Sequence, residues 1–254
     1  MRLRALAACA VTGQLLPGVV WATTVSFSPP SGGTGSARHA EAAFLAGLTS
    51  YVTESFEAFI LPGGARGPGS EGGLVRASFT TSIGTFSQQA PPPRLAAELC
   101  SPTCGDGLAV LSRRTSPFDG RFAIGPGRQW LDSNDASLLR VTFAEPYIAV
   151  GFFLTDPNDF GHLTIDVFGG GAASLALAPG FPSGFSTYVW VTEPAGIRTI
   201  DFTVAGSRND GFGIDRLSVA AAATPEPVPE PGTLLLLGAG LLVLGRRTRR
   251  RLSA

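Results

Sequence analysis

Apolar and polar residues alternate with a period of two over most of the chain, a pattern typical of β-strands with one buried side. In residues 197–204, Ile200, Phe202 and Val204 share one face, and the residues that alternate with them from 199 onward are polar. Seven further runs of β-branched and aromatic residues end at Gly, Pro, Asn or Asp: 54–60, 74–79, 137–143, 147–154, 163–168, 187–192 and 212–219. Eight such strands predict an all-β sandwich.

The segment before these strands has helical spacing instead. In residues 37–48, Ala43, Phe44 and Leu48 form an apolar stripe with small neighbours, and Ser36 is expected to be the N-cap. We therefore predict one short N-terminal helix on an otherwise all-β domain. Stretches rich in turn-forming residues are expected to be loops: 28–36, 61–72 and 87–107.

The first 22 residues, MRLRALAACAVTGQLLPGVVWA, have the layout of a secretory signal peptide. Two arginines precede a moderately apolar stretch, Pro17-Gly18 breaks it, and Ala22 supplies a small residue at the exit. We expect cleavage after Ala22 and prefer export to the alternative of a first core helix. Cys9 superficially fits a lipoprotein box, but too few apolar residues precede it for lipidation to be expected.

Residues 223–254 consist of three physically different parts. A proline-rich lead-in, expected to be stiff and extended, precedes an apolar run over residues 232–245. This run is shorter than the roughly 20 residues that span a bilayer core, so we expect it to insert only with local thinning. A cluster of arginines follows and is expected to stay cytoplasmic: Arg246, Arg247, Arg249, Arg250 and Arg251.

This tail resembles the PEP-CTERM sorting signal of Gram-negative bacteria in its Val228-Pro229-Glu230-Pro231 motif, its leucine- and glycine-rich helix and its terminal arginines. The resemblance implies recognition by an exosortase, a membrane-embedded cysteine transpeptidase, and assigns Pro229, Glu230 and Pro231 to recognition rather than catalysis. A second Pro-Glu-Pro at 225–227 leaves the processing point open. An ordinary single-pass anchor is the alternative, but the short apolar run favours a sorting signal.

The charge balance argues against nucleic acid as a partner, because 19 basic and 19 acidic residues give a net charge of zero. All the basic residues are arginine, and the chain contains no lysine. Seven of the arginines lie at the two ends, so residues 23–224 carry 12 Arg and 17 acidic residues, a charge of −5.

Cys100 and Cys104 are separated by Ser-Pro-Thr, and in an exported domain we expect them to form a disulfide that pins a loop. A zinc site is the alternative. It is disfavoured because there is no second cysteine pair and the chain has only two histidines, His39 and His162.

The central domain resembles a jelly-roll domain found in many PEP-CTERM proteins in three segments that follow the helix: 55–59, 150–161 and 209–219. It is also similar, more distantly, to the galactose-binding-like sandwiches of carbohydrate-binding modules. Such modules often pair an early Glu with a last-strand Asp around a structural calcium ion, and Glu57 and Asp215 occupy the matching places. The alternative is that both carboxylates accept hydrogen bonds from the backbone or from Arg216.

Two aromatic residues, Trp130 and Tyr188, are candidate glycan contacts, because a flat apolar ring suits the C–H face of a sugar. Most aromatic residues, including Trp190, are expected in the core. The segments 156–159 (DPND) and 209–211 (NDG) have the composition of turns, and calcium loops are the second interpretation of them.

No arrangement of residues predicts catalysis. The chain has no Gly-x-Ser-x-Gly motif and no lysine for a phosphate-binding loop, and His39 and His162 are expected at the surface or a strand edge. Four carboxylates are considered for a glycosidase pair, but no two are closely spaced on one strand face: Glu57, Glu145, Asp166 and Glu193.

The sequence therefore predicts a signal peptide (1–22), an exported jelly-roll β-sandwich (23–222) and a sorting signal (223–254). We expect a non-catalytic component of the cell envelope or exopolysaccharide matrix, anchored in the inner membrane during transit. Its expected partners are the secretion machinery, an exosortase, the membrane and extracellular polysaccharide, with calcium as the one cofactor considered. A specific carbohydrate-binding module is the alternative, and a glycan-cleaving enzyme is less favoured.

Overall fold

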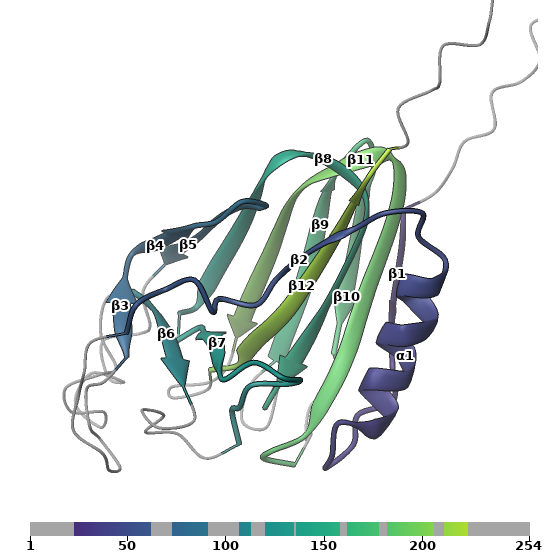
Figure 1. The fold of residues 1–254 in the computed structure, drawn as a ribbon. Helices are drawn as coiled ribbons and strands as arrows, with labels where there is room; N and C mark the ends of the chain where they lie inside the picture. The colour runs from purple at the N-terminus through teal and green to yellow at the C-terminus, as the bar shows by residue number, and fades with distance from the viewer. Residues whose placement is uncertain are drawn as a thin grey trace, which may run out of the picture. The chain divides into compact units, whose positions relative to one another are not determined.

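The computed structural model describes residues 23–61, 73–90, 107–112, 120–134, 136–157, 162–177, 182–205 and 211–222. The chain divides into two compact units, Met1–Ala221 and Ala222–Ala254, and every helix and strand of the described residues belongs to the first unit. Strands dominate that unit, as the alternating pattern predicted (Figure 1).

The elements of the described residues occur in a simple order, with one helix near the start. They are β1 (Thr24–Phe27), α1 (Gly35–Ala46), β2 (Val52–Glu54), β3 (Leu74–Arg76), β4 (Ser78–Thr80), β5 (Gly84–Ala90), β6 (Leu108–Ser112), β7 (Gln129–Asp132), β8 (Leu138–Thr155), β9 (His162–Gly169), β10 (Ala172–Ala176), β11 (Ser186–Ala205) and β12 (Gly213–Ala221). All the strand pairs in this set are antiparallel.

Two long strands, β8 and β11, pair with each other and run through both layers of the sandwich. In the first layer, residues 147–155 and 186–192 of these strands lie between β1 and β12, and β2, β7, β6 and β3 extend that side. In the second layer, residues 138–143 and 197–205 lie between β9 and β5, with β10 and β4 at the edges. The described residues thus build an all-β jelly-roll sandwich with one short helix, as the sequence predicted for this domain.

Both long strands change layer at a Glu-Pro corner, residues 144–146 in β8 and 193–196 in β11. The pairing register shifts there between Thr192 and Ile197. Proline cannot donate a ladder hydrogen bond, which favours a bend at this point. Gly196 has φ of +96°, and a Cβ on it would lie only 2.7 Å from the Cβ of Pro146, so glycine is required where the two corners meet.

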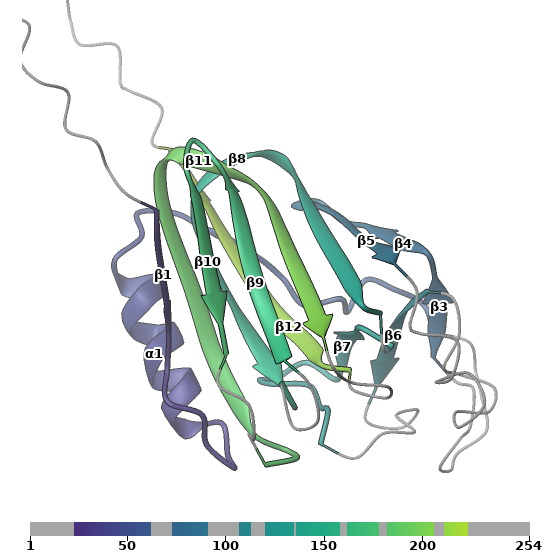
Figure 2. The same ribbon diagram turned by 180° about the vertical axis from the view of Figure 1, so that it is seen from behind.

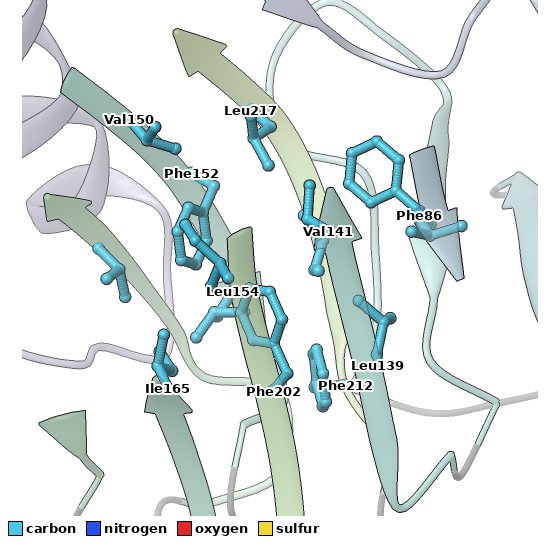
Figure 3. Packing of buried hydrophobic residues seen from close by; sticks show 14 of the residues in the cluster. Phe86, Leu139, Val141, Val150, Phe152, Leu154, Ile165, Phe202, Phe212 and Leu217 are labelled. Atoms are coloured by element: carbon cyan, nitrogen blue, oxygen red, sulfur yellow. The ribbon is translucent and has the colours of Figure 1, made fainter. Parts of the chain in front are cut away.

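The main core lies between the layers, where side chains from both inner faces interdigitate (Figure 3). The ring of Phe152 in the first layer meets that of Phe202 in the second, with centroids 5.4 Å apart in an edge-to-face arrangement. Phe212 packs against Phe202 at 5.5 Å, and Phe56 packs against Phe86 at 5.2 Å. Buried aromatic pairs of this kind stabilise the contact beyond the burial of their area, so these rings hold the layers together.

The outer face of the first layer is covered by α1 and by residues 120–124. We call it the covered face, and its cluster consists of Ala37, Ile124, Phe153 and Tyr188, with Ala40, Phe44, Phe122 and Trp190 partly buried around them. Figure 1 shows α1 beside β1 and β11. The helix therefore closes one side of the sandwich with a second, smaller apolar core.

The structure corrects several predicted element boundaries. Two strands were predicted at 137–143 and 147–154, but both belong to the single strand β8. The strands predicted at 187–192 and 197–204 likewise belong to the single strand β11, and both long strands continue through the corners. The prediction of a strand over 54–60 was wrong, since β2 ends at Glu54 and the chain then turns. Several short strands, including β1 and β5, were missed because a run of three to seven residues contains too few alternations to distinguish a strand from a loop.

The helix was predicted correctly, but its contact face was not. Thr34 rather than Ser36 is the N-cap, and it makes no side-chain capping hydrogen bond. Ala43, which was assigned to the apolar stripe, is exposed, whereas Glu41 is buried. A charged residue lies on the packed face because Arg216 of β12 reaches it, an interaction that the spacing of apolar residues does not reveal.

Candidate functional site

The second layer presents an outer face of polar side chains, which we call the open face. Along each of its strands most apolar residues point into the core, and the side chains between them, most of which are polar, point outward. The outward side chains are Ser78, Thr80, Thr85, Ser87, Arg140, Thr142, Thr164, Asp166, Phe168, Ser174, Thr199, Asp201 and Thr203. None of the helices and strands among the described residues packs on this face, and Figure 2 shows β9 and β10 uncovered in front.

One row of the open face carries its charges. Arg140 of β8 is the register partner of Asp201 in β11, which in turn pairs with Asp166 in β9. Arg140 Nε and Nη2 donate to the two carboxylate oxygens of Asp201, each at 2.7 Å, and the hydrogen bond to Asp201 raises the pKa of Arg140. Such a two-pronged pair holds the guanidinium flat against the sheet and cancels one of the two negative charges.

A second row consists of hydroxyl groups. Thr80, Thr85, Thr142 and Thr199 are successive register partners across four strands, and Phe168 continues the row on β9. The hydroxyl oxygens of Thr80 and Thr85 lie 3.2 Å apart. Neighbouring strands are about 4.8 Å apart, so the row offers hydrogen-bonding groups at regular intervals. The ring at its end is 43% exposed and presents an apolar surface to solvent.

The predicted glycan contacts Trp130 and Tyr188 are wrong, since their side chains are 1% and 0% exposed. Trp130 lies on the covered side, packed with Ala109, Leu111 and Ala123. Tyr188 lies between Phe153 and Phe44 beneath the helix. Buried rings of this kind cannot stack on a sugar, and the sequence did not show that other segments would cover them.

Burial also decides the electrostatics of Tyr188. It raises the pKa of the phenol far above its usual value, and the nearby carboxylate of Glu41 raises it further. The hydroxyl has no hydrogen-bond partner among the described residues and lies over Gly151, where a Cβ would come within 2.2 Å of it. The group therefore stays protonated and fills space rather than taking part in proton transfer.

The pair predicted for calcium, Glu57 and Asp215, lies on the two sides of residues 124–129 and accepts hydrogen bonds from their backbone. Glu57 Oε1 accepts from the N–H groups of Arg128 and Gln129 at 2.5 and 2.6 Å. Asp215 Oδ2 accepts from the N–H of Ile124 at 2.6 Å, and its Oδ1 accepts from its own neighbour at 2.7 Å. The alternative of backbone hydrogen bonds is therefore observed for both carboxylates.

Asp215 is 1% exposed, and burial raises the pKa of its carboxyl to about 7, to which the negative charge of Glu57 contributes. Calcium takes six to eight oxygen ligands. Within the described residues no group of three or more His, Cys, Asp or Glu is placed to hold a metal. Two carboxylates committed to N–H donors are an incomplete donor set, and calcium at Glu57 and Asp215 stays a prediction.

Arg216 was expected to pair with these carboxylates, but its guanidinium points elsewhere. Arg216 Nε donates to Glu41 Oε1 of α1 at 2.8 Å, while only its backbone N–H reaches Asp215. Arg216 has φ of +49°, and the register of β12 against β8 shifts between Asp215 and Ser218. This bulge aims the long side chain at the helix, so it attaches α1 to the sheet.

The other carboxylates considered for catalysis and the two histidines lie at separate places among the described residues. Glu193 is buried in the β11 corner, Glu145 is exposed in the β8 corner and Asp166 lies on the open face. His39 on α1 and His162 at the start of β9 are exposed, as predicted. Asp156, expected in a turn, is buried with φ of +55° and accepts a hydrogen bond from the N–H of Gly184 at 2.8 Å.

Several predictions concern residues outside those that the structure describes. They include the signal peptide, Cys100 and Cys104, the segment 209–210, the Pro-Glu-Pro residues 229–231 and the arginine cluster. Within the described ranges, no helix is long and apolar enough to cross a membrane.

Comparison with known proteins identifies the tail. Residues 227–251 match the PEP-CTERM protein-sorting motif. The match includes Pro229-Glu230-Pro231 in full but only the last residue of the earlier Pro-Glu-Pro at 225–227. The motif implies export, transit through the membrane and processing by an exosortase, as the resemblance of the sequence indicated. No curated protein matches the chain.

Several solved structures match the chain at low sequence identity and low TM-score. A variant of the family 29 carbohydrate-binding module CBM29-2 is 14% identical, with 71% of this chain and 100% of that chain covered and a TM-score of 0.28. The family 11 carbohydrate-binding module from Clostridium thermocellum is 11% identical, with 68% and 96% covered and a TM-score of 0.28. The enzymatically active domain of tailspike protein 4 from bacteriophage CBA120 is 14% identical, with 60% and 20% covered and a TM-score of 0.24.

The open face was not identified as a site from the sequence, although one signal for it was present. The polar residues that alternate with Ile200 and Phe202 showed that β11 has a polar side. That Arg140 lies beside Asp201 depends on the pairing of strands 61 residues apart, and no local pattern specifies this register.

Proposed function

We propose that this protein is a non-catalytic component of the bacterial cell surface or exopolysaccharide matrix, exported and then sorted by an exosortase. The sorting motif over residues 227–251 carries this proposal. A tail of this kind directs the sorting of the protein, so the function after export belongs to the sandwich domain.

The geometry of the sandwich supports delivery from a membrane anchor. Thr24, Thr192, Ala149 and Ala220 are successive register partners in β1, β11, β8 and β12. The start of β1 and the end of β12 therefore lie in one cross-strand row, about 14 Å apart. Figure 1 shows both at the same end of the sandwich. A domain with this arrangement can fold while both of its ends lead toward one membrane surface.

The sorting proposal is tested by two single substitutions in the tail. Glu230→Ala changes the Pro-Glu-Pro inside the matched motif, whereas Glu226→Ala makes the same change in the earlier copy just outside it. In a host with an exosortase, we expect Glu230→Ala to leave the protein in the membrane fraction and Glu226→Ala to release it like the wild type. Immunoblots of the membrane, surface and medium fractions measure this. Release of both variants, or retention of Glu226→Ala alone, contradicts the assignment.

A second candidate function, binding of an uncharged polysaccharide, is favoured by the chemistry of the open face. Rows of hydroxyl groups and a guanidinium–carboxylate pair can donate to and accept from sugar hydroxyls. The ring of Phe168 at the end of one row is suited to the C–H side of a sugar. Asp166 leaves a surplus negative charge beside Asp201, which disfavours an acidic polymer.

Affinity electrophoresis of the released protein in gels containing the host's exopolysaccharide tests this second function. We expect the wild type to be retarded, and Arg140→Ala or Phe168→Ala to weaken the apparent affinity at least about fivefold. Arg38→Ala, on the exposed side of α1, is the matched control and should be retarded normally. Equal mobility of all variants with and without polysaccharide argues for a purely structural component. The appearance of new reducing ends would instead support a glycan-cleaving enzyme.

A further inference from the structure

The first described residue, Thr23, lies opposite a buried carboxylate. β1 pairs antiparallel with β11 in the register Thr24 to Thr192 and Val25 to Val191. One step further along this register, Thr23 faces Glu193, the first residue of the β11 corner. The side chains meet as the register requires, since Thr23 Oγ1 donates a hydrogen bond to Glu193 Oε2.

Glu193 is a buried carboxylate, only 2% exposed, in the corner of β11. Its Oε1 accepts from the N–H of Ala195 at 2.9 Å. None of the ion pairs formed within the described ranges involves Glu193. A buried carboxylate needs a positive partner or a full set of donors, because the loss of its hydration is costly. Two donors from neutral groups leave this requirement incompletely met.

Glycine residues close the space around the two side chains. A Cβ on Gly171, in the hairpin between β9 and β10, would lie 2.6 Å from Thr23 Oγ1 and 3.0 Å from Glu193 Oε2. On Gly170 it would lie 2.0 Å from the Cβ of Ala195. Only a hairpin without side chains can approach the corner this closely, so the carboxylate and Thr23 are enclosed from that side.

We infer that the α-ammonium group of Thr23, exposed when the signal peptide is removed after Ala22, forms an ion pair with Glu193. Three covalent bonds separate the nitrogen of a threonine from its own Oγ1, so the two atoms lie about 3 to 4 Å apart. With Oγ1 already bound to Glu193, the nitrogen is within the distance at which opposite charges interact strongly. This inference goes beyond the proposed function and depends on the predicted cleavage after Ala22.

The ion pair would make maturation a stabilising step. In the precursor, the nitrogen of Thr23 belongs to a neutral peptide bond with Ala22, and Glu193 is in none of the ion pairs between described residues. Cleavage of that bond creates the charge at the position where the carboxylate is buried. The hydrogen bond of Thr23 to Glu193 and the pairing of β1 with β11 are present before cleavage, and the ion pair adds to them only in the exported chain.

The absence of lysine makes this pair directly measurable, because the α-amino group is the only primary amine of the mature chain. Pairing with a carboxylate raises the pKa of an α-amino group above its usual value of about 7.7 to 8.0 and slows its acylation near neutral pH. The protein is isolated after export, its N-terminus is read by intact mass, and its rate of labelling by an amine-reactive ester at pH 7.5 is compared with that of a peptide of residues 23–27.

We expect the mature protein to begin at Thr23 and to react at least about tenfold more slowly than the peptide. Glu193→Gln should bring the rate close to that of the peptide, whereas Glu145→Gln, in the exposed corner of β8, should leave it slow. Insertion of one alanine between Ala22 and Thr23 keeps Glu193 and moves the ammonium about 3.8 Å outward. The insertion variant should also react quickly, and it tests the inference even if the Glu193→Gln protein does not fold and cannot be isolated.

Three results would each overturn the inference. One is a mature N-terminus at any residue other than Thr23. Another is a wild-type rate equal to that of the peptide. The third is slow labelling of both the Glu193→Gln protein and the protein with the inserted alanine, which would show that enclosure alone protects the amine.

Discussion

The two outer faces of the sandwich share the two long strands β8 and β11 and yet differ in polarity and in what covers them. On the covered face, β8 and β11 direct aromatic side chains outward, among them Phe153 and Tyr188, and α1 packs on them. On the open face, the same strands direct Arg140 and Asp201 outward, and no described helix or strand covers them. The change takes place at the Glu-Pro corners, where each strand passes from one layer to the other.

This difference shows how one strand can serve two purposes. Before the corner, the outward positions of β8 contribute polar groups to a surface, and after it they contribute to a second apolar core. Polar residues suit an exposed interaction surface, because such a face can remain in contact with water when no ligand is bound. Stability and interaction are thereby separated onto opposite sides of the sandwich.

The largest effect is expected from breaking the covered face. Tyr188→Ala removes a fully buried ring that contacts Phe44, Phe153 and Trp190. We expect the free energy of unfolding to fall by about 3 to 5 kcal/mol, measured by urea denaturation of the released protein. Tyr188→Phe is the control. It removes a buried hydroxyl without a partner among the described residues, so it should leave stability unchanged or raise it by up to about 1 kcal/mol. A large loss in the Phe variant would contradict this account.

A smaller effect should follow from the charge of Asp215 at the edge of the covered face. Because burial raises the pKa of this carboxyl to about 7 from its ordinary value of 3.8, the native state binds a proton that the unfolded state has lost between these pH values. The free energy of unfolding should therefore fall by about 2 to 4 kcal/mol in total as the pH rises from about 4 to about 7. Above pH 7 the titration of Asp215 should change it little.

Asp215→Asn should remove this part of the pH dependence, which is read from the difference between the melting curves of the wild type and the variant at pH 5 and pH 8. The addition of calcium tests the alternative that Glu57 and Asp215 bind a metal ion. An ion held by Glu57 and Asp215 would lower the pKa of Asp215, so that adding calcium at pH 8 would raise the melting temperature of a chelator-treated sample. An unchanged melting temperature would leave both carboxylates as acceptors of backbone hydrogen bonds alone.

The smallest effect on stability is expected on the open face. Arg140→Ala breaks a pair whose arginine side chain is 40% exposed, and Thr199→Ala removes a hydroxyl from the row of threonines. We expect each to change the free energy of unfolding by less than about 1 kcal/mol in urea denaturation. The loss of binding proposed for Arg140→Ala would then reflect contact with the ligand. A loss of several kcal/mol would instead identify the charge pair as structural.

Two features of this protein, a half-buried strand and the sorting tail, could be predicted from short stretches of its sequence. The alternation around Ile200 and Phe202 determines a strand with one buried side, because successive side chains of a strand point in opposite directions. The tail is equally local, since Pro-Glu-Pro, an apolar run and an arginine cluster follow one another within one segment, and the sorting motif matches there. Both predictions needed only neighbouring residues.

Only the tertiary structure decided which side of each strand would be covered and which residues would meet. Trp130 and Tyr188 were predicted as glycan contacts, because the sequence could not show that other segments pack over them. The meeting of Arg216 with Glu41, and of Thr23 with Glu193, joins residues more than 150 positions apart. Such contacts depend on strand register and on a bulge, which are set by the packing of the whole sandwich rather than by any local pattern.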